Sequence, residues 1–571
     1  MKKKLTLVLL VFHLCAHPQT VLPYNVIISE IMADPSPAVG LPSTEFIELR
    51  NTSSRAINLN GWQIADAGNT AVITIHFILQ PDSMVIICAN TAMSALAAFG
   101  AVAGVSNFPS LDNEGDLLYL RSKEGNIIHA VNYSAAWYKN AVKSQGGWSL
   151  EIIDPANACG GAANWTASIN PQGGTPGRKN SVDGSNTDLQ PPVLLQAFAA
   201  DSVHVLLTFD EPLDSLQAAG VIHYSINYNI GTPVSATTVG PLFNTVSLVT
   251  AVPLATNTVY AITATGITDC SGNSIGADHT VKLGRTAVAG AGAIVINEIL
   301  FNPVPGGADY VEIYNRSNTI IDLKECYLAG RSANGVIGPV KQISPVNRVI
   351  FPGEYRVITE DPAAVQQQYL AKDPSALMTI AVMPSLPDDK GNLLLLNTQG
   401  KIIDELSYDA HWHFKLIVNA QGVSLERIDY NQPTQNPSNW HSAATSAGYG
   451  TPGYQNSQFR NDTSFTGSIR LAPPVFSPDN DGWDDFCTIN YQFPGPGYVC
   501  NITAFDAAGR PVRYITRNAL CAQQGYFRWD GLSENNTRLP IGVYVIYTEV
   551  FNLAGTTKRF KQAVTLARRL D

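Results

Sequence analysis

The sequence predicts an all-β protein made of several β-sandwich domains in tandem, and three observations support this fold class. Two distant parts of the chain repeat the same short motifs in the same order. Within each repeat, apolar residues alternate with polar ones, which is the period of a strand with one buried face. The chain contains 45 Gly and 35 Pro, which supply the turns that many short strands require. Because 571 residues exceed what one core normally holds, we expect several domains.

The first twenty residues have the pattern of a secretory signal peptide. Lys2, Lys3 and Lys4 precede an apolar run over residues 5–14, and small and polar residues follow. This run is too short to span a membrane, and no later segment is long and apolar enough. A lipoprotein signal at Cys15 is the alternative, although His13 and Leu14 stand where small residues are usual. We therefore expect a secreted protein or one on the outer cell surface, without a membrane span.

Charge and cysteine content narrow the function classes further. The net charge is −10, and removing the three signal lysines takes it to −13 (−10 − 3), so we expect no nucleic-acid binding. The eight cysteines fall to seven without Cys15, which argues against a full disulfide framework. Cys487, Cys500 and Cys521 are close in sequence, and we expect one bridge among them, whose pairing the sequence leaves open.

The internal repeat defines two copies of one domain. The matching segments are residues 26–31 and 294–299, 45–51 and 309–315, 117–120 and 393–396, 149–151 and 424–426, and the Thr-Pro-Gly endings at 175–177 and 451–453, with Tyr133, Trp137 and Trp165 matching Tyr408, Trp412 and Trp440. In each copy, turn sequences such as Asn60-Gly61 separate the predicted strands. Residues 92–99 and 362–369 are expected to form a short helix or a loop.

These repeated motifs resemble the lamin tail domain. The resemblance rests on the glutamate-bearing first strand, the Glu-Phe-Ile-Glu-Leu-Arg-Asn strand at 45–51, and the Ser-Leu-Glu, Trp and Thr-Pro-Gly ending. It implies an immunoglobulin-like (Ig-like) β-sandwich over residues 24–181 and again over 294–458, of a kind found in exported bacterial proteins. The second copy departs from the pattern at Cys326-Tyr327, where the first has Gly61-Trp62.

Two further domains are expected from weaker resemblances. Residues 189–286, with Thr-Phe-Asp-Glu-Pro-Leu at 208–213, resemble the bacterial Ig-like domains of surface-layer proteins. Residues 472–571, with Trp529-Asp530-Gly531 and Gly542-Val543-Tyr544, resemble the FlgD-type Ig-like fold and the C-terminal sorting domains of type IX secretion substrates. That resemblance implies contact with secretion machinery as one alternative.

One acidic loop has the residue types of a calcium site. Asp479, Asn480, Asp481, Asp484 and Asp485 surround Gly482, and calcium prefers carboxylate and carbonyl oxygens on a tight loop. The loop lacks the closing glutamate of an EF-hand. The alternative is an acidic turn whose side chains bond its own backbone. Apart from this calcium ion, we expect no cofactor.

A second set of polar residues falls on strands that are expected to be buried. Its members are Glu30, Glu48 and Asn51 in the first copy and Glu298, Glu312 and Asn315 in the second. Buried glutamates are unfavourable unless they are paired or bind a metal ion. We favour a hydrogen-bond network between the first two strands. A divalent-ion or ligand site and a pair of hydrolytic carboxylates are the alternatives.

The remaining candidate residues carry weaker signals. His411 and His413 flank Trp412 and have the residue type of zinc ligands, but the first copy has Ala136 and Tyr138 there. Trp62, Trp137, Trp148 and Trp165 provide either core packing or a carbohydrate-stacking surface.

The sequence contains none of the common catalytic motifs. We therefore expect a non-catalytic exported protein that serves in extracellular binding, adhesion or envelope structure, with a protein or a polysaccharide as its ligand. The alternatives are an accessory or cryptic secreted hydrolase of the nuclease or phosphatase type, and a carbohydrate-binding protein.

Overall fold

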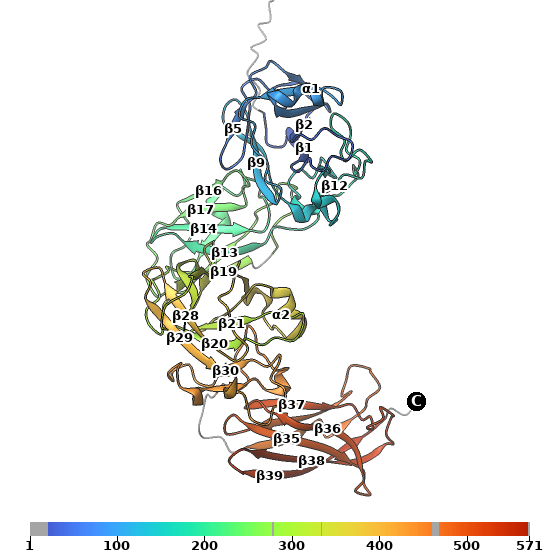
Figure 1. Ribbon diagram of the computed structural model, residues 1–571, viewed down its shortest axis with the longest axis vertical. Helices are drawn as coiled ribbons and strands as arrows, with labels where there is room; N and C mark the ends of the chain where they lie inside the picture. Colours follow the sequence, from blue (N-terminus) through green and yellow to red (C-terminus); the bar gives the residue numbers. More distant parts are fainter. Residues whose placement is uncertain (1–20, 277–278, 333, 460–466, 569–571) are drawn as a thin grey trace, which may run out of the picture. The chain divides into compact units, whose positions relative to one another are not determined.

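The computed structural model describes residues 21–276, 279–332, 334–459 and 467–568. They form two compact units. Unit 1 extends to residue 255 and includes residues 260–283, and unit 2 comprises residues 256–259 and the chain from residue 284 onward. Strands dominate both units, which confirms the all-β fold class (Figure 1). The predicted signal peptide lies outside the described residues.

The first repeat domain, at the start of unit 1, is a sandwich of two main sheets. The larger sheet has the order β12 (Trp165–Ala167), β11 (Leu150–Ile152), β1 (Val26–Met32), β2 (Phe46–Asn51), β7 (Met84–Ala89) and β8 (Val102–Val105). The smaller has the order β10 (Ile127–Ser134), β9 (Gly115–Arg121), β4 (Gln63–Ala65) and β5 (Thr70–Val72), and β3 (Ile57–Asn58) pairs with β6 (Ile78–Leu79). Alternate aliphatic side chains of the two sheets form one core.

The middle domain completes unit 1. Its two sheets have the orders β13 (Leu194–Ala199), β14 (His204–Phe209), β17 (Thr245–Val249), β16 (Ser235–Val239), and β15 (Tyr224–Ile226), β18 (Tyr260–Ala264), β19 (His279–Leu283). Every strand pair in these two sheets is antiparallel. Phe209, Tyr224 and Ile262 are among the buried residues of a separate core.

The second repeat domain begins unit 2 and has the same architecture as the first. Its larger sheet has the order β27 (Leu377–Thr379), β26 (Tyr355–Thr359), β21 (Tyr310–Asn315), β20 (Ile294–Leu300), β30 (Leu425–Arg427) and β31 (Trp440–Ser442). Its smaller sheet has the order β24 (Lys341–Gln342), β23 (Cys326–Gly330), β28 (Lys390–Asn397) and β29 (Ile402–Asp409), and β22 (Ile321–Asp322) pairs with β25 (Val349–Ile350).

The segments left open between helix and loop contain short helices. α1 (Met93–Leu96) in the first repeat domain and α2 (Pro362–Gln368) in the second occupy the same place in the fold, after β7 and β26. Asp361 caps α2 by accepting the Ala364 N–H at 3.0 Å. No helix among the described residues has both the length and the apolar character that crossing a membrane requires.

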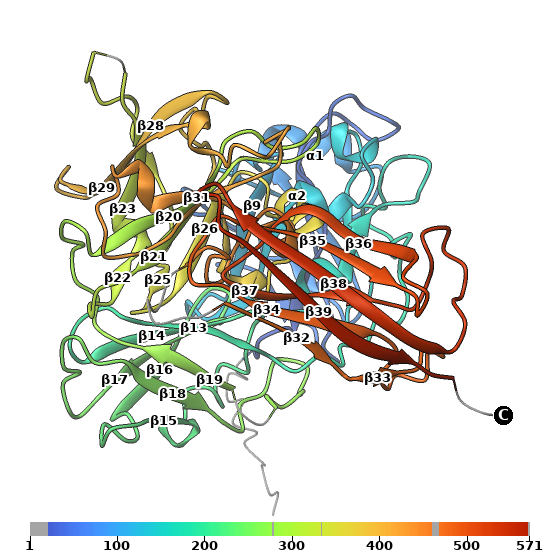
Figure 2. The same cartoon turned by 90° about the horizontal axis from the view of Figure 1, so that it is seen from below.

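The C-terminal domain is the second sandwich of unit 2. One sheet has the order β32 (Ser468–Ala472), β34 (Cys487–Gln492), β37 (Gln524–Trp529). The other has the order β33 (Val475–Phe476), β39 (Thr557–Leu566), β38 (Gly542–Asn552), β35 (Tyr498–Phe505), β36 (Pro511–Leu520). The long strands β38 and β39 run side by side in Figure 2. Trp529 lies in the core between the sheets.

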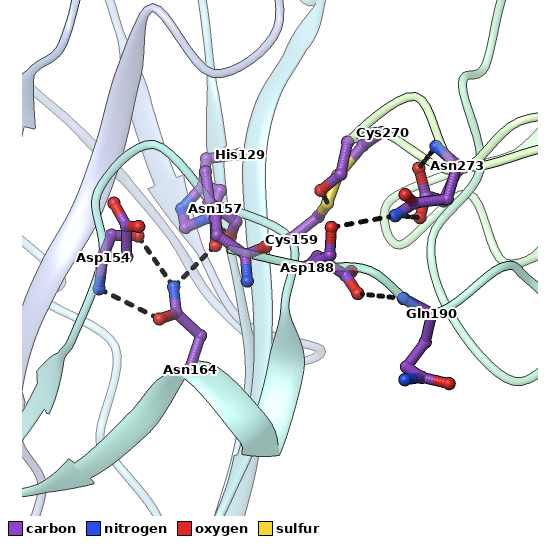
Figure 3. The surroundings of a disulfide bond; sticks show 12 residues. His129, Asp154, Asn157, Cys159, Asn164, Asp188, Gln190, Cys270 and Asn273 are labelled. Carbon is purple, nitrogen blue, oxygen red and sulfur yellow. Dashed lines mark hydrogen bonds between the residues drawn. A yellow bond between two sulfur atoms is a disulfide. The ribbon is translucent and has the colours of Figure 1, made fainter. Parts of the chain in front are cut away.

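The two units join their domains by different means. In unit 1, a disulfide links Cys159 of the first repeat domain to Cys270 of the middle domain (Figure 3). In unit 2, Phe414 of the second repeat domain packs with Val499 and Leu520 of the C-terminal domain. The expected bridge among Cys487, Cys500 and Cys521 is wrong, because all three are buried free thiols. Folding pairs cysteines 111 residues apart, which sequence proximity cannot indicate.

Candidate functional site: two buried glutamate clusters

Three glutamates lie side by side in the larger sheet of the first repeat domain. Glu30 on β1 is opposite Glu48 on β2 and Glu151 on β11, and all three are fully buried. Glu30 accepts hydrogen bonds from the Ser149 hydroxyl at 2.6 Å and from the Thr175 N–H at 2.8 Å. The cluster therefore contacts the Thr-Pro-Gly segment that closes the domain.

The other two carboxyls also bond that closing segment. Glu48 accepts the Gly177 N–H at 2.6 Å and the Ser29 hydroxyl at 2.8 Å. Glu151 accepts the hydroxyls of Thr175 and Ser181, each at 2.8 Å. Each glutamate thus replaces its water shell with donors, most of which come from residues 175–182.

The second repeat domain repeats this arrangement with Glu298, Glu312 and Glu426. Glu298 accepts the Thr451 N–H at 2.9 Å, and Glu312 accepts the Gly453 N–H at 2.6 Å. Glu426 accepts the Thr451 and Ser457 hydroxyls, each at 2.8 Å. One donor is new, because the Tyr310 hydroxyl bonds Glu298 at 2.6 Å where the first repeat domain has Phe46.

Burial raises the pKa of Glu30, Glu48, Glu298, Glu312 and Glu426. It raises the pKa of Glu48 to about 7, and burial with the neighbouring Glu298 raises the pKa of Glu426 to about 8. Burial followed by neighbouring carboxylates also places the pKa values of Glu30 and Glu312 well above the ordinary value. Burial raises the pKa of Glu298 as well, against the opposing effect of its four hydrogen bonds.

Asn51 and Asn315 belong to a different contact. The Asn51 amide donates to the carbonyls of Arg55 and Leu79, at 2.6 and 2.9 Å. The Asn315 amide donates to the carbonyls of Thr319 and Ile350, at 2.8 and 3.1 Å. Both side chains fasten the loop that follows the second strand, and these bonds are separate from the glutamate clusters.

A β-bulge in the first strand brings in residues that sequence reasoning missed. The register shifts between Ile28 and Glu30, and the buried Ile28 N–H donates to His129 Nδ1 at 2.9 Å. Burial lowers the pKa of His129 to about 4, so the ring accepts this bond in its neutral form. The other ring nitrogen is 2.9 Å from the Ala158 carbonyl.

In the second repeat domain, an ion pair provides the acceptor for the backbone N–H at the equivalent bulge. The Ile296 N–H donates to Asp404 Oδ2 at 2.8 Å, and the Arg427 guanidinium lies 3.1 Å from the same oxygen. Arg427 is fully buried and also donates to the Ile296 carbonyl at 2.7 Å. Burial lowers its pKa to about 10, and the residue stays charged at neutral pH.

The acidic loop predicted to bind calcium lies in the C-terminal domain, between β33 and β34. Oxygens of Asp479, Asp481 and Asp485 lie within 4.8 Å of one another. Asp485 also accepts the backbone N–H groups of Asn480 at 2.6 Å and Gly482 at 3.0 Å. Asp484 has a positive φ of 50° and is not part of this carboxylate cluster. Three of the four predicted aspartates are therefore brought together.

A second acidic cluster, absent from the sequence predictions, lies in unit 1 beside the disulfide. Oxygens of Asp188, Glu211 and Asp269 lie within 4.8 Å of one another. Asn273 donates to Asp269 at 2.8 Å and to the Asp188 carbonyl at 3.2 Å (Figure 3). Burial, with the nearby charges of Asp188 and Asp269, raises the pKa of Glu211 to about 8.

The remaining candidates are mostly packing residues. Trp165 is 1% exposed and Trp62 is 3% exposed, so neither is part of an open stacking surface. Trp148 is half-buried beneath Lys143, whose ammonium lies 4.3 Å from the ring centroid. His413 is buried against the Ser442 hydroxyl, whereas His411 is exposed beside Asp409, so they do not face a common site.

The sequence did carry a signal for the residues missed in the glutamate clusters. Glu151 and Glu426 stand in the repeated Ser-Leu-Glu motif, and Thr175 and Thr451 open the repeated Thr-Pro-Gly motif. Repetition in both copies indicated importance, but it did not show that these motifs meet Glu30 and Glu298 in space.

Family models match three of the four domains. Residues 22–135 and 287–410 match the family model of the Lamin Tail Domain, and residues 188–283 match that of the Bacterial Ig-like domain. No curated protein matches the chain.

The solved structures that it resembles are distant. The N-terminal part of the bacterial S-layer protein SbsC is 16% identical with a TM-score of 0.16, over 28% of this chain and 44% of that one. CopC from Methylosinus trichosporium OB3b is 15% identical with a TM-score of 0.14, over 19% of this chain and 98% of that one. A Ca²⁺-stabilized adhesin of an Antarctic bacterium is 10% identical with a TM-score of 0.12, over 96% of this chain and 100% of that one. The family matches identify two lamin tail domain regions with a bacterial Ig-like domain between them.

Proposed function

We propose that this chain is a non-catalytic surface or secreted protein whose β-sandwich domains carry binding surfaces outside the cytoplasm. One observation carries the proposal. In both repeat domains, all three buried glutamates accept hydrogen bonds from the segment that closes the domain. These carboxyls are the best candidates for acid–base chemistry in the repeat, and their contacts suit a structural latch.

The alternative is a hydrolase that uses these carboxyls, and it requires access of substrate and water to them. An acid–base pair needs a reacting bond and a water molecule within hydrogen-bond reach. Glu30 and Glu298 are 0% exposed, and their neighbours are protein donors. Burial of this kind favours the structural role, and the proposal treats both clusters as latches.

The test incubates the purified protein, with Ca²⁺ and Mg²⁺, against immobilised glycans, nucleic acids, proteins and phosphoesters. Retention of the protein on a glycan or protein without product release is the expected result. Product formation that disappears in Glu30→Gln or Glu298→Gln would overturn the proposal. Asn51→Asp is the matched control, because it alters a buried polar residue of the same sheet outside the cluster.

We include calcium in the proposal, bound by Asp479, Asp481 and Asp485. Three carboxylates on one short loop supply the hard oxygens that calcium prefers, and backbone carbonyls or water would complete its shell. The C-terminal domain should then melt at a higher temperature in millimolar calcium, and Asp481→Ala should lose that response. A midpoint of the wild-type protein that does not change with calcium would contradict this assignment.

Export and cell-surface location are also part of the proposal. They are supported by the basic and apolar N-terminal sequence and by the resemblance of residues 472–571 to sorting domains. Deleting residues 472–571 should retain the protein inside the outer envelope if this domain meets secretion machinery. Unchanged release into the medium would remove the sorting role and leave the signal peptide as the export signal.

A further inference from the structure

Strand β37 forms an open edge of the smaller sheet in the C-terminal domain. The strand pairs with β34 on one side only. The Phe493 N–H donates to the Gln523 carbonyl at 2.7 Å, and antiparallel bonds recur at every second residue. This alternation directs the backbone N–H and C=O groups of Gly525, Phe527 and Trp529 toward β34. Those of Gln524, Tyr526 and Arg528 therefore point away from the sheet.

The opposite edge strand, β32, is consistent with this alternation. The same alternation directs the Ile469 carbonyl on β32 away from β34, and the Gln562 side chain donates to this carbonyl at 3.0 Å. Among the described residues, β34 is the only strand that pairs with β37, so the alternation leaves the backbone N–H groups of Gln524, Tyr526 and Arg528 without a strand partner. An edge of this kind is a template for another strand.

A cleft of about 790 Å³ lies along this edge. Residues 522–526 form one wall, and the second repeat domain forms the other with residues 446–448 and 454–457. The Thr445 hydroxyl accepts the Leu520 N–H at 3.2 Å, and the Ser446 and Tyr491 hydroxyls lie 2.6 Å apart. The Ser457 carbonyl accepts the Gln523 N–H at 3.0 Å. These bonds hold the two walls together, so the cleft is formed before any ligand binds.

The lining suits a peptide backbone. Gln455, Gln492, Gln523 and Gln524 line the cleft, and a glutamine amide can both donate to and accept from a peptide group. Tyr454 and Tyr526 add aromatic surface. Among the described residues, Lys372 is the only charged residue of the lining, although the whole chain carries a net charge of −10. The cleft therefore fits a neutral or acidic segment better than a basic one.

We propose that an extended, neutral or acidic segment of a partner protein adds to the open edge of β37 within this cleft. Main-chain bonds to Gln524 and Tyr526 provide affinity, and the glutamines and tyrosines select side chains. A strand of about five residues spans the open groups of β37. The inference rests on the proposed binding function and names the ligand class of one surface.

The test screens the full-length protein against an array of ten-residue peptides that vary in charge and against an array of neutral oligosaccharides. The tightest peptide is then titrated against three variants. Tyr526→Pro removes an outward N–H and is expected to weaken binding at least about tenfold, while Tyr526→Phe keeps the N–H and stays within about twofold. Val72→Pro is the matched control, because Val72 has an outward N–H on the edge strand β5 of unit 1.

Two further measurements keep the inference falsifiable if Tyr526→Pro fails to fold. Ala447→Trp fills the opposite wall and is expected to weaken the peptide by a similar factor. Amide exchange at residues 524–528 is expected to slow when the peptide binds. Binding of oligosaccharides alone, no binding of any peptide, or equal peptide affinity in every variant would overturn the inference. Retention of the protein on another extracellular ligand would still support the proposed function.

Discussion

The two repeat domains have the same bulge in their first strand and satisfy it with different chemistry. The first places neutral His129 against the Ile28 N–H and has Ile152, a residue of the apolar core, where the second has Arg427. The second places the Asp404–Arg427 ion pair at the equivalent positions. The glutamate cluster is common to both, so the bulge and the cluster are the constant features. The comparison teaches that the buried donor must be satisfied, whereas the acceptor can be a neutral ring or a carboxylate.

The largest expected effect comes from breaking the ion pair. Asp404→Ala leaves the Arg427 guanidinium buried without its counter-charge and should lower the free energy of unfolding of the second repeat domain by about 3 to 5 kcal/mol. Chemical denaturation of the full chain measures this loss.

The matched control copies the first repeat domain into the second. Asp404→His combined with Arg427→Ile reproduces the pair His129 and Ile152, so most of the lost stability should return. If the double variant is as unstable as Asp404→Ala, the two arrangements are not interchangeable and the comparison fails.

The disulfide distinguishes the two units. Replacing Cys159 and Cys270 by Ser opens a link between residues 111 apart and should destabilise unit 1 by about 2 to 4 kcal/mol. Unit 2 joins its domains by apolar packing and hydrogen bonds instead, so amide exchange in its strands should not change. Equal loss of protection in both units would contradict this difference between them.

The next largest effect is that of acid pH, which should act on the His129 contact of the first repeat domain. The pKa of His129 is lowered to about 4, whereas an unfolded histidine titrates near 6.5. The unfolded state therefore binds a proton first as the pH falls, and His129 by itself lowers the stability of the first repeat domain by about 2 kcal/mol between pH 7 and pH 5. His129→Gln keeps an acceptor that does not titrate. The buried glutamates titrate in both proteins, so the difference between wild type and variant isolates the histidine. Parallel stability curves would disprove its role.

The smallest effect concerns the hydroxyl that the first repeat domain lacks. Tyr310→Phe removes one donor from Glu298 and should cost about 1 kcal/mol, because three other bonds remain. Phe46→Tyr in the first repeat domain is the reciprocal change, and thermal unfolding of both variants measures the pair. An unchanged midpoint in Tyr310→Phe would mean that this bond contributes nothing net.

Much of the fold could be predicted from the sequence because strands have a local signal. Alternation, turn residues and the repeat predicted an all-β sandwich, and the family matches support both repeats and the domain between them. The glutamate clusters were predicted only in part. Glu30 and Glu48 lie on neighbouring strands, but Thr175 reaches Glu30 across 145 residues, and no local pattern reports such a contact. The Cys159–Cys270 pairing was not predicted for the same reason.

The central claim is that the buried glutamates are structural latches, and their ionisation tests it most directly. An unfolded glutamate has a pKa near 4.3, whereas burial raises the pKa of Glu48 to about 7 and of Glu426 to about 8. The folded state therefore holds protons that the unfolded state has released. The stabilisation is complete below the unfolded pKa and is lost as the pH rises through the folded values.

The decisive measurement is the free energy of unfolding between pH 6.5 and 8.5, with and without Ca²⁺ and Mg²⁺, for the wild type and Glu426→Gln. The account predicts that wild-type stability falls with rising pH, that the variant falls less steeply, and that divalent ions leave this difference unchanged. A divalent ion that raises stability in the wild type but not in Glu426→Gln would show that the cluster binds metal, and it would contradict the account.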